Sequence, residues 1–379
     1  MTANHTKSPD YPLPCYLLDE EKLIANLKLI KSIRREAGVD IILAFKAFAL
    51  WPIFPLLKKY LSGATASSLW EALLCQEEMG IKAHTYAPAY LPEDIKKICE
   101  LSSHLTVNSL EEYYRHEHIF KKNKVSIGLR VNPEFSTVKT DLYNPASVGS
   151  RLGVAIEGLE KNGLPSGIEG LHFHTLCESS AQDFKSTLNV FEKKFKKYFK
   201  QLKWVNFGGG HLMTKKGYDV DLLIATLSAF KRRHRLNIIL EPGSAIAWET
   251  GDLHSRILDI VENGGIKTAI LDVSFTAHMP DTLEMPYRPD ITDTHPKGKY
   301  KYKLGGVSCL AGDALDYYNF EAPLQVGDVL VLKDMMHYTM VKTTMFNGVK
   351  HPSIAVKKKN GSVEVLRKFT FADFKNRLG

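Results

Sequence analysis

Two periods of hydrophobic residues alternate along the chain from residue 20 to residue 241. Segments with apolar residues three and four positions apart, such as 20–38, predict amphipathic helices, and Gly38 marks the end of this one. Short apolar runs such as 39–45 predict buried strands. The predicted strands cover residues 39–45, 62–67, 83–89, 104–109, 124–132, 168–175, 203–210 and 237–243. A helix separates each strand from the next, which predicts a (β/α)8 TIM-like barrel, with a doubly wound parallel sheet as the main alternative.

Short alternating segments replace the helices in the last third of the chain. They predict strands at 254–263, 266–274, 302–309, 327–334, 353–358 and 362–368. Residues 13–20 are also strand-like and are expected to join them. We therefore expect a barrel over residues 20–241 and an all-β domain formed by residues 1–19 and 242–379. Within the barrel, a Gly-, Pro- and Ser-rich stretch over 133–153 predicts a mobile loop near a site.

Composition and charge narrow the class of protein. Of the 379 residues, 44% are hydrophobic and 24% are charged, as expected for a globular enzyme with a large core. The net charge of +8 suggests nucleic-acid binding, but the basic residues are spread over helices such as 191–204 and 228–235, without a nucleic-acid-binding motif. Neither a membrane-spanning apolar stretch nor a secretory signal is found, so we expect a cytoplasmic protein.

The cysteines indicate reduced thiols rather than disulfides. The chain has Cys15, Cys75, Cys99, Cys177 and Cys309, an odd number with no CxxC pair. This pattern suggests neither a disulfide framework nor a zinc site, and no metal is predicted. A reducing compartment fits best.

Chemically useful side chains stand at the C-terminal ends of the predicted strands, where barrel enzymes carry their catalytic groups. Lys46 follows the first strand, Arg130 ends the fifth, His174 the sixth and Glu241 the eighth. The glycines Gly208–Gly210 follow the seventh, where loops often bind phosphate. Backbone N–H groups without side chains can converge there on an anion.

Each of these residues also has a structural explanation. Lys46 lies in the apolar run 41–48, where a lysine can extend its ammonium group back to water. His174 can be a hydrogen-bonded core histidine, and the three glycines can form a flexible turn. Glu241 can cap the turn that begins at Pro242. Their joint occurrence at strand ends favours a site.

Together these residues describe a site for pyridoxal 5'-phosphate (PLP). A desolvated lysine has a lowered pKa and can form a Schiff base with the cofactor, so Lys46 would carry it. Glu241 would pair with the pyridine nitrogen and keep it protonated, so that the ring takes up electrons. His174 would stack on the ring, and the glycine loop would bind the phosphate.

One family of enzymes has motifs similar to several segments of this chain. The alanine-racemase-fold (fold type III) PLP decarboxylases, which include ornithine, arginine and diaminopimelate decarboxylases, resemble it in LAFKA, HFHT, NFGGGH, LEPGSAIAWETGD and SCLAGDALDY. Within this group, the carboxynorspermidine/carboxyspermidine decarboxylases resemble it most, in HMPD, EMPYRP and CLAGD. The resemblance covers nearly the whole chain. It implies a PLP barrel with a C-terminal β domain, in a homodimer with active sites at the subunit interface.

The resemblance assigns roles within the predicted barrel. It implies that Lys46 is the Schiff-base lysine, His174 the ring-stacking histidine and Glu241 the partner of the pyridine nitrogen. Gly209 and Gly210 resemble the phosphate-binding glycines. All five residues lie in the matching motifs.

Further roles follow from the same resemblance beyond the barrel. Tyr338 resembles a tyrosine that reaches the phosphate, and Cys309 the cysteine that the partner subunit supplies near Cα; the other cysteines are expected to be inert core thiols. Asp313 resembles an acid that faces the distal amine of the substrate. Ornithine-type relatives read EPGR where this chain has Ser244 as the last residue, so Ser244 or backbone must bind phosphate instead of an arginine. This departure weakens an ornithine assignment.

A substrate with several amines requires carboxylates near the site. The candidates are Asp313, Glu249, Glu178, Asp281, Glu284 and Asp316, with a solvated surface role as the alternative for most of them. Asp313 is favoured, followed by Glu249 and Glu178. Arg130 and Arg288 would bracket the site, with a structural ion pair as the alternative for either.

The resemblance implies decarboxylation of carboxynorspermidine or carboxyspermidine in polyamine biosynthesis, with Cys309 or Lys46 returning a proton to Cα. Diaminopimelate decarboxylase or another basic amino-acid decarboxylase is the first alternative. A racemase would need a tyrosine base where this chain has Cys309. A homologue that carries PLP or binds a partner without turnover is the alternative outside enzymes.

Overall fold

A computed structural model of the chain describes residues 9–138, 144–147, 149–284 and 287–379. The chain divides into two compact units, one of residues 25–246 and the other of residues 1–24 together with 247–379. Part of the loop 133–153 lies outside the described residues, so its predicted mobility stays a prediction. Met285 and Pro286 of the EMPYRP motif also lie outside them.

The unit of residues 25–246 contains a closed barrel of eight parallel strands in chain order. The strands are β2 (Asp40–Ala44), β3 (Gly63–Ala66), β4 (Ala83–Tyr86), β5 (Ser102–Val107), β6 (Ser126–Arg130), β7 (Gly170–His172), β8 (Trp204–Asn206) and β9 (Asn237–Leu240). Ile41 of β2 pairs with Leu240 of β9, which closes the barrel. The predicted barrel is confirmed, and the doubly wound sheet is excluded.

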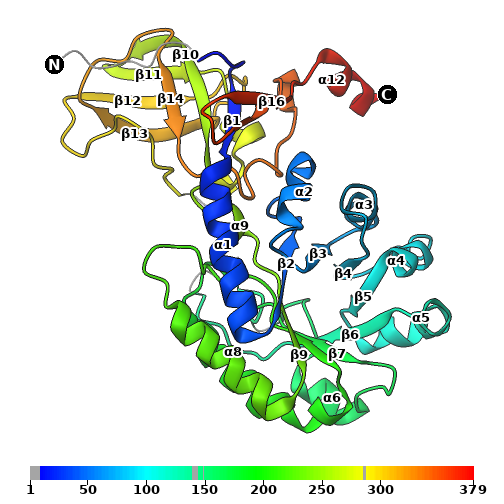
Figure 1. The fold of residues 1–379 in the computed structure, drawn as a ribbon. Helices are drawn as coiled ribbons and strands as arrows, with labels where there is room; N and C mark the ends of the chain where they lie inside the picture. The colour runs from blue at the N-terminus through cyan, green and yellow to red at the C-terminus, as the bar shows by residue number, and fades with distance from the viewer. Residues whose placement is uncertain (1–8, 139–143, 148, 285–286) are drawn as a thin grey trace. The chain divides into compact units, whose positions relative to one another are not determined.

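Helices connect successive strands and lie outside them, as Figure 1 shows for α3 to α6 and α8. The helical segments are α1 (Glu20–Ala37), η1 (Trp51–Ile53), α2 (Phe54–Leu57), α3 (Leu69–Leu74), η2 (Cys75–Met79), α4 (Ile95–Leu101), α5 (Leu110–Asn123), α6 (Ile156–Asn162), α7 (Ala181–Phe195), η4 (Lys196–Gln201) and α8 (Val220–His234). The longer helices α5, α7 and α8 each bury an apolar stripe, which includes Leu110, Phe184 and Leu223 respectively.

Local capping fixes where these helices begin and end. Ser68 accepts a hydrogen bond at 3.2 Å from the backbone N–H of Glu71 and so caps α3. The Glu71 carboxylate accepts from the N–H of Ser67 at 2.6 Å, one residue before the position expected for a capping box. Gly38, with φ of +63°, follows the last residue of α1 as predicted.

A tryptophan fills the interior at the amino-terminal end of the barrel. An added Cβ would lie 2.3 Å from the Trp204 indole at Gly128 and 2.2 Å from it at Gly170. These two glycines therefore leave a slot for the ring on β6 and β7. The indole Nε1 donates a hydrogen bond to the Ser126 hydroxyl at 2.8 Å, which fixes its orientation.

The second unit is built on a mixed sheet in the order β13-β12-β11-β10-β1-β15-β16, with β14 paired to β10. Its strands are β1 (Cys15–Asp19), β10 (Gly251–Asn263), β11 (Ile266–Leu271), β12 (Tyr300–Gly305), β13 (Ala314–Phe320), β14 (Val329–Leu332), β15 (Ser353–Lys357) and β16 (Val363–Arg367). β1 lies between β10 and β15. The expectation that residues 13–20 join this sheet is confirmed.

The sequence pattern missed β13 and the short helices of this unit. The buried residues Leu315 and Tyr318 of β13 stand three positions apart, because the register with β12 shifts there. Such a bulge breaks the alternation by which a strand is recognised. The helical segments are α9 (Ser244–Ala247), α10 (Phe275–His278), α11 (Asp281–Glu284), η5 (Phe346–Gly348) and α12 (Phe371–Leu378), of which α9 begins in the barrel unit.

Candidate active site at the carboxyl ends of the barrel strands

The carboxyl ends of the barrel strands bring the predicted barrel residues together. Lys46 follows β2, Arg130 ends β6 and Glu241 follows β9. His174 comes two residues after β7, and Gly208–Gly210 follow β8. The positive charge of Lys46 affects the pKa values of both Glu241 and His174, so the three side chains lie close to one another.

Glu241 is the buried acid of this site, with 5% of its surface exposed. Its Oε1 accepts a hydrogen bond from Asn206 Nδ2 at 2.6 Å. Its Oε2 lies 3.7 Å from Nε2 of His172 and 3.9 Å from Nδ1 of His174. Burial raises the pKa of Glu241, while the hydrogen bond from Asn206 and the charge of Lys46 oppose this rise. The carboxylate is thus held in one place, with one oxygen turned toward the imidazoles.

His174 is a neutral imidazole with a defined tautomer. Its Nδ1 accepts a hydrogen bond from the backbone N–H of Gly209 at 3.3 Å, so the ring proton is on Nε2. Burial lowers the pKa of His174 well below its usual range, and the positive charges of Lys46 and Arg130 lower it further. A flat, uncharged ring suits stacking on an aromatic cofactor.

Lys46 is more accessible than the sequence predicts. Its neighbours Phe45 and Ala47 are buried, whereas Lys46 itself keeps exposed surface. The direction of its pKa still agrees with the predicted desolvation of the amine. The barrel walls still remove part of its hydration. This dehydration is the main reason why the pKa of Lys46 is lowered, with a contribution from Arg130, while Glu241 acts in the opposite direction. A reachable amine with a lowered pKa is a nucleophile for a carbonyl group.

Arg130 is buried and holds the backbone beside the site. Its Nη2 donates a hydrogen bond to the carbonyl oxygen of His174 at 3.0 Å. Its guanidinium carbon lies 4.7 Å from the ring centre of Tyr86, a cation–π contact. Arg130 therefore positions His174, and its direct contact with a cofactor stays a prediction.

The glycine loop lies so close to its neighbours that side chains are excluded. An added Cβ would lie 2.7 Å from Cγ of His174 at Gly208 and 2.2 Å from the carbonyl oxygen of Leu176 at Gly210. The N–H of Gly209 is used by His174. Gly210 is half-buried, and we find no hydrogen bond from its N–H to the described residues. This N–H is available to an anion, although phosphate binding here stays a prediction.

Two residues of this site were missed from the sequence. Asn206 orients Glu241, and it also accepts a hydrogen bond from the N–H of Gly208 at 2.8 Å. His172 is 1% exposed, and neither ring nitrogen has a hydrogen-bond partner in the described part of the chain. Side chains two residues apart face the same side of a strand. The HFHT motif therefore contained a signal for His172, because this residue stands two positions before His174.

Cys309 and Asp313 lie in the second unit, between β12 and β13. The thiol-bearing Cys309 is exposed. Asp313 is buried, and its carboxylate accepts hydrogen bonds from the N–H of Thr276 at 3.1 Å and from the Ser308 hydroxyl at 2.6 Å. These bonds hold the turn that carries Cys309. Binding of a substrate amine by Asp313 stays a prediction, because its oxygens already accept hydrogen bonds.

The other candidates of the second unit form two groups. Some have side-chain partners, and others have left-handed backbone. Asp281 pairs with Lys342, and Arg288 lies over the ring of Tyr318 at 4.0 Å, so both have structural partners. Tyr338 has φ of +52° and Glu249 has φ of +53°. In the barrel, Glu178 has φ of +46° and is exposed. Left-handed backbone at residues other than glycine is often retained at functional sites.

The cysteines differ from the prediction at one position. Burial raises the pKa of Cys15, Cys75 and Cys99 to about 12, as expected for inert core thiols. Cys177 is exposed, so the prediction that it belongs to the core is wrong. Burial of its thiol raises its pKa, but the charge of Lys46 lowers it, which places Cys177 beside the site.

The donor set fits PLP. Lys46 offers an accessible amine for the aldehyde, Glu241 a carboxylate for the ring nitrogen, His174 a neutral ring for its face and Gly210 an N–H for the phosphate. The side chains of His172, His174 and Glu241 also bring three donor atoms within 4.8 Å, a spacing that a metal ion could use. One of these atoms, Nδ1 of His174, already accepts a hydrogen bond, and the lysine has no role in such a metal site.

Known proteins resemble this chain over almost its full length. Residues 15–336 match the family model described as "Pyridoxal-dependent decarboxylase, C-terminal sheet domain". A carboxyaminopropylagmatine decarboxylase of Synechocystis sp. is 52% identical over 371 residues, which cover 97% of this chain and 96% of that protein. A carboxynorspermidine/carboxyspermidine decarboxylase of Campylobacter jejuni is 41% identical over 377 residues, covering 96% and 98%. The solved structure of carboxynorspermidine decarboxylase with norspermidine from the same species has a TM-score of 0.89 and 38% identity, covering 97% and 100%.

Proposed function

The chain belongs to the pyridoxal-dependent decarboxylase family, and we propose that it removes the carboxylate of a carboxylated polyamine. The observation that carries this proposal is the joint placement of Lys46, His174 and Glu241 at the strand ends of a chain that matches such decarboxylases end to end. The family resemblance inferred from the motifs is confirmed.

Each barrel residue of the site has a separate role in holding the cofactor. When bound, PLP supplies a conjugated ring that withdraws electrons from Cα of the substrate. Lys46 would hold the cofactor through its amine. Glu241 would face the ring nitrogen and favour its protonated form, because an ionised carboxylate stabilises a neighbouring cationic base. His174 lies against the ring, and Asn206 and Arg130 hold these two residues in place. The motifs assign the phosphate to Ser244 and Gly210, and they give the same role to Tyr338.

Cys309 of the partner subunit completes the site in this proposal. The bond between Cα and the carboxylate breaks, CO2 leaves, and a proton must return to Cα. Cys309 or Lys46 supplies this proton. The exposed position of Cys309 supports the first choice, because the thiol is accessible to a second copy of the chain.

Carboxynorspermidine and carboxyspermidine are the substrates that the relatives of Campylobacter and the motifs support. Their distal amines are cationic, and a carboxylate would bind them at low cost in desolvation. Glu178 and Glu249 are exposed and have left-handed backbone, whereas Asp281 is already paired with Lys342. The two glutamates therefore suit this task better than Asp281. Products would be norspermidine and spermidine.

Carboxyaminopropylagmatine is a second candidate substrate. The relative that bears this name shares 52% of its residues with this chain, more than the Campylobacter protein at 41%. Agmatine ends in a planar guanidinium group, which favours a bidentate carboxylate over a single ammonium ligand. Diaminopimelate would instead require a group, usually an arginine, for its second α-amino carboxylate.

Release of CO2 from purified holoenzyme would test the substrate. The panel should contain carboxynorspermidine, carboxyspermidine, carboxyaminopropylagmatine, diaminopimelate, ornithine and arginine. We expect turnover of one of the first three, with kcat/KM at least about tenfold above the rest, since a missing charged contact costs about that much. Turnover of diaminopimelate alone would contradict the proposal.

Covalent attachment of the cofactor would be tested by reduction with borohydride. We expect loss of the yellow colour and a pyridoxyl group on the peptide that contains Lys46. The variant Lys46→Ala should remain colourless after reduction, whereas Lys82→Ala, a change at an exposed barrel lysine, should behave like the wild type. A modified residue other than Lys46 in the wild type would contradict the assignment.

The shared site would be tested by mixing two inactive variants. Lys46→Ala and Cys309→Ala, co-expressed, should recover about a quarter of wild-type activity if each site takes its cysteine from the other subunit, because one site in half of the dimers is intact. If no activity returns while heterodimers form, Cys309 acts in its own subunit or not at all.

The place of this protein in the cell also remains a proposal. None of the helices in the described ranges has the length and apolar composition needed to cross a bilayer. We propose a cytoplasmic enzyme, and cell fractionation followed by the decarboxylase assay would test it. Activity confined to the membrane fraction would contradict the proposal.

A further inference from the structure

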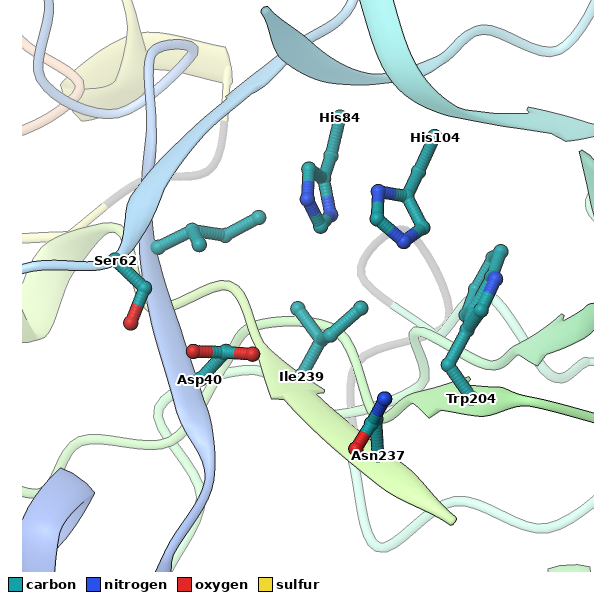
Figure 2. Close-up of a pocket in the computed structure, with 8 residues that line it drawn as sticks. Asp40, Ser62, His84, His104, Trp204, Asn237 and Ile239 are labelled. Carbon is teal, nitrogen blue, oxygen red and sulfur yellow. The ribbon is translucent and has the colours of Figure 1, made fainter. Parts of the chain in front are cut away.

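A cavity lies at the end of the barrel opposite Lys46, where the strands begin. Its volume is about 170 Å³. It is lined among others by Asp40, His84, His104, Trp204, Asn237 and Ile239, all from the barrel unit. Figure 2 shows the rings of His84 and His104 on one side of the cavity and Asp40 and Asn237 on the other. From its lining, we propose that this cavity binds a small organic cation with an alkyl chain and a terminal ammonium group.

Asp40 supplies the charge for such a ligand. It is the only side chain of fixed charge in the lining, at the start of β2, and it is exposed. None of the ion pairs found among the described residues joins a lysine or arginine to its carboxylate, although the protein has a net charge of +8. An unpaired carboxylate at the edge of a cavity attracts a cation from solution.

Two neutral imidazoles line the same cavity, and Nδ1 of one of them, His104, is already bonded to the Ser103 hydroxyl at 3.1 Å. The ring centres of His84 and His104 lie 4.0 Å apart, with the ring planes tilted by 30°, so two positive charges there would repel each other. Burial, together with the charge of His104, lowers the pKa of His84 well below its usual range. Burial lowers the pKa of His104, although Asp40 and Glu169 act in the opposite direction. Nδ1 of His84 is buried and has no hydrogen-bond partner in the described part of the chain.

The remaining walls suit the alkyl part of the ligand. Ile42, Trp204 and Ile239 form a buried apolar cluster that lines the cavity. The indole Nε1 of Trp204 is used by Ser126, so the ring offers its apolar surface rather than its donor. An ammonium group near Asp40 and a hydrocarbon chain against Trp204 and Ile239 would satisfy both kinds of wall.

A metal ion fits this cavity less well than an organic cation. Metal ligands must converge within a few ångströms of one point. Among the described residues, the donors that converge in this way, within 4.8 Å, are those of His172, His174 and Glu241, at the other end of the barrel. Asp40, His84 and His104 do not form such a group.

This inference goes beyond the decarboxylase reaction and does not depend on it. Binding at the start of the strands requires neither Lys46 nor the cofactor. The cavity would let a short amine associate with the barrel without entering the catalytic site.

The experiment measures the binding of putrescine, a short aliphatic diamine, to the PLP-loaded enzyme by isothermal titration calorimetry. Putrescine that enters the catalytic site contributes equally to wild type and variants. We expect Asp40→Asn to weaken one class of sites by at least about tenfold, because one charge-assisted hydrogen bond is lost. Asp40→Glu should retain binding, since the carboxylate is kept. Asp221→Asn, at an exposed aspartate of α8, is the matched control and should bind like the wild type.

Activity without added putrescine should be the same in wild type and in Asp40→Asn, because Asp40 lies away from the catalytic residues. A wild-type isotherm that Asp40→Asn leaves unchanged would overturn the proposal. Binding of Zn²⁺ or Ni²⁺ that depends on Asp40, without any binding of putrescine there, would overturn it in favour of a metal site. Failure of the decarboxylase assay would leave this binding result unaffected, so the two proposals can be told apart.

Discussion

At the scale of single residues, the site depends on keeping two imidazoles neutral and one carboxylate buried beside a lysine. Burial lowers the pKa of His174 and raises that of Glu241, while Lys46 and Arg130 supply positive charge nearby. The sequence identified Lys46, His174 and Glu241 because they stand at strand ends. It could not show that Lys46 is exposed, because exposure depends on residues from other strands.

The pH dependence of cofactor attachment follows from the lowered pKa of Lys46. Only the neutral amine attacks an aldehyde, so attachment of PLP to the apo-protein should increase with pH. The midpoint should fall below about 10.4, the value of an ordinary lysine. Borohydride trapping at a series of pH values, quantified on the Lys46 peptide, would measure it. Peptides with exposed lysines such as Lys82 serve as the internal control, and a Lys46 midpoint equal to theirs would contradict the expectation.

Glu241→Gln should reduce catalysis without reducing the free energy of unfolding at neutral pH. The loss of the charge beside the ring nitrogen should reduce kcat by about a hundredfold or more. Burial raises the pKa of Glu241 in the folded state, so its ionised form costs stability above the folded pKa, and this cost disappears below the unfolded pKa. The free energy of unfolding of the apo-variant should therefore equal or exceed that of wild type at neutral pH, and the difference should shrink as the solution becomes acidic.

Urea denaturation of both apo-proteins at neutral and acidic pH would measure this difference. Asn206→Asp, which replaces the hydrogen-bond donor by a second acid, is the informative companion variant, because two carboxylates would then compete for one proton. A large loss of stability in Glu241→Gln at neutral pH would show that the charge stabilises the apo-barrel.

At the scale of elements, the loop after β8 joins the ends of three strands. Gly208 receives a hydrogen bond from Glu241 after β9, and Gly209 donates one to His174 after β7. The sequence predicted this loop from its three glycines. Their tight packing against β7 could not be predicted, because it is set by the spacing of strands far apart in the chain.

Gly210→Ala should destabilise the protein through this packing. Its φ is +84°, and an added Cβ would lie 2.2 Å from the carbonyl oxygen of Leu176. Gly217 has the same φ but open space around it. Gly217→Ala is therefore a matched control that measures the cost of the left-handed backbone alone. We expect Gly217→Ala to cost about 1–3 kcal/mol and Gly210→Ala clearly more, with weaker binding of PLP. Urea denaturation would measure both, and equal costs would contradict the packing argument.

At the scale of the whole molecule, the first strand of the chain lies in the middle of a sheet formed mainly by its last third. β1 pairs with β10 on one side and with β15 on the other, and Leu18 on it is fully buried. The hydroxyl of Tyr16 donates to the carbonyl oxygen of His278 at 2.7 Å. The second unit therefore needs both ends of the chain.

Leu18→Ala should reveal the importance of this strand. Removing a buried leucine side chain costs about 2–5 kcal/mol. Leu17 on the same strand is only half-buried, so Leu17→Ala should cost clearly less. The free energy of unfolding in urea would be compared for the two variants. Similar losses would show that the two faces of β1 are equally important.

The sequence by itself determined the barrel, the strands that carry the site and the residue types at their ends, because periodicity and position along a parallel strand are local properties. Tertiary structure alone decided that His172 and Asn206 join Glu241, that Asp313 holds a turn and that Asp40 lines one cavity with the imidazoles of His84 and His104. Those contacts depend on distances between strands that are remote in the chain, and no local pattern of residues specifies them.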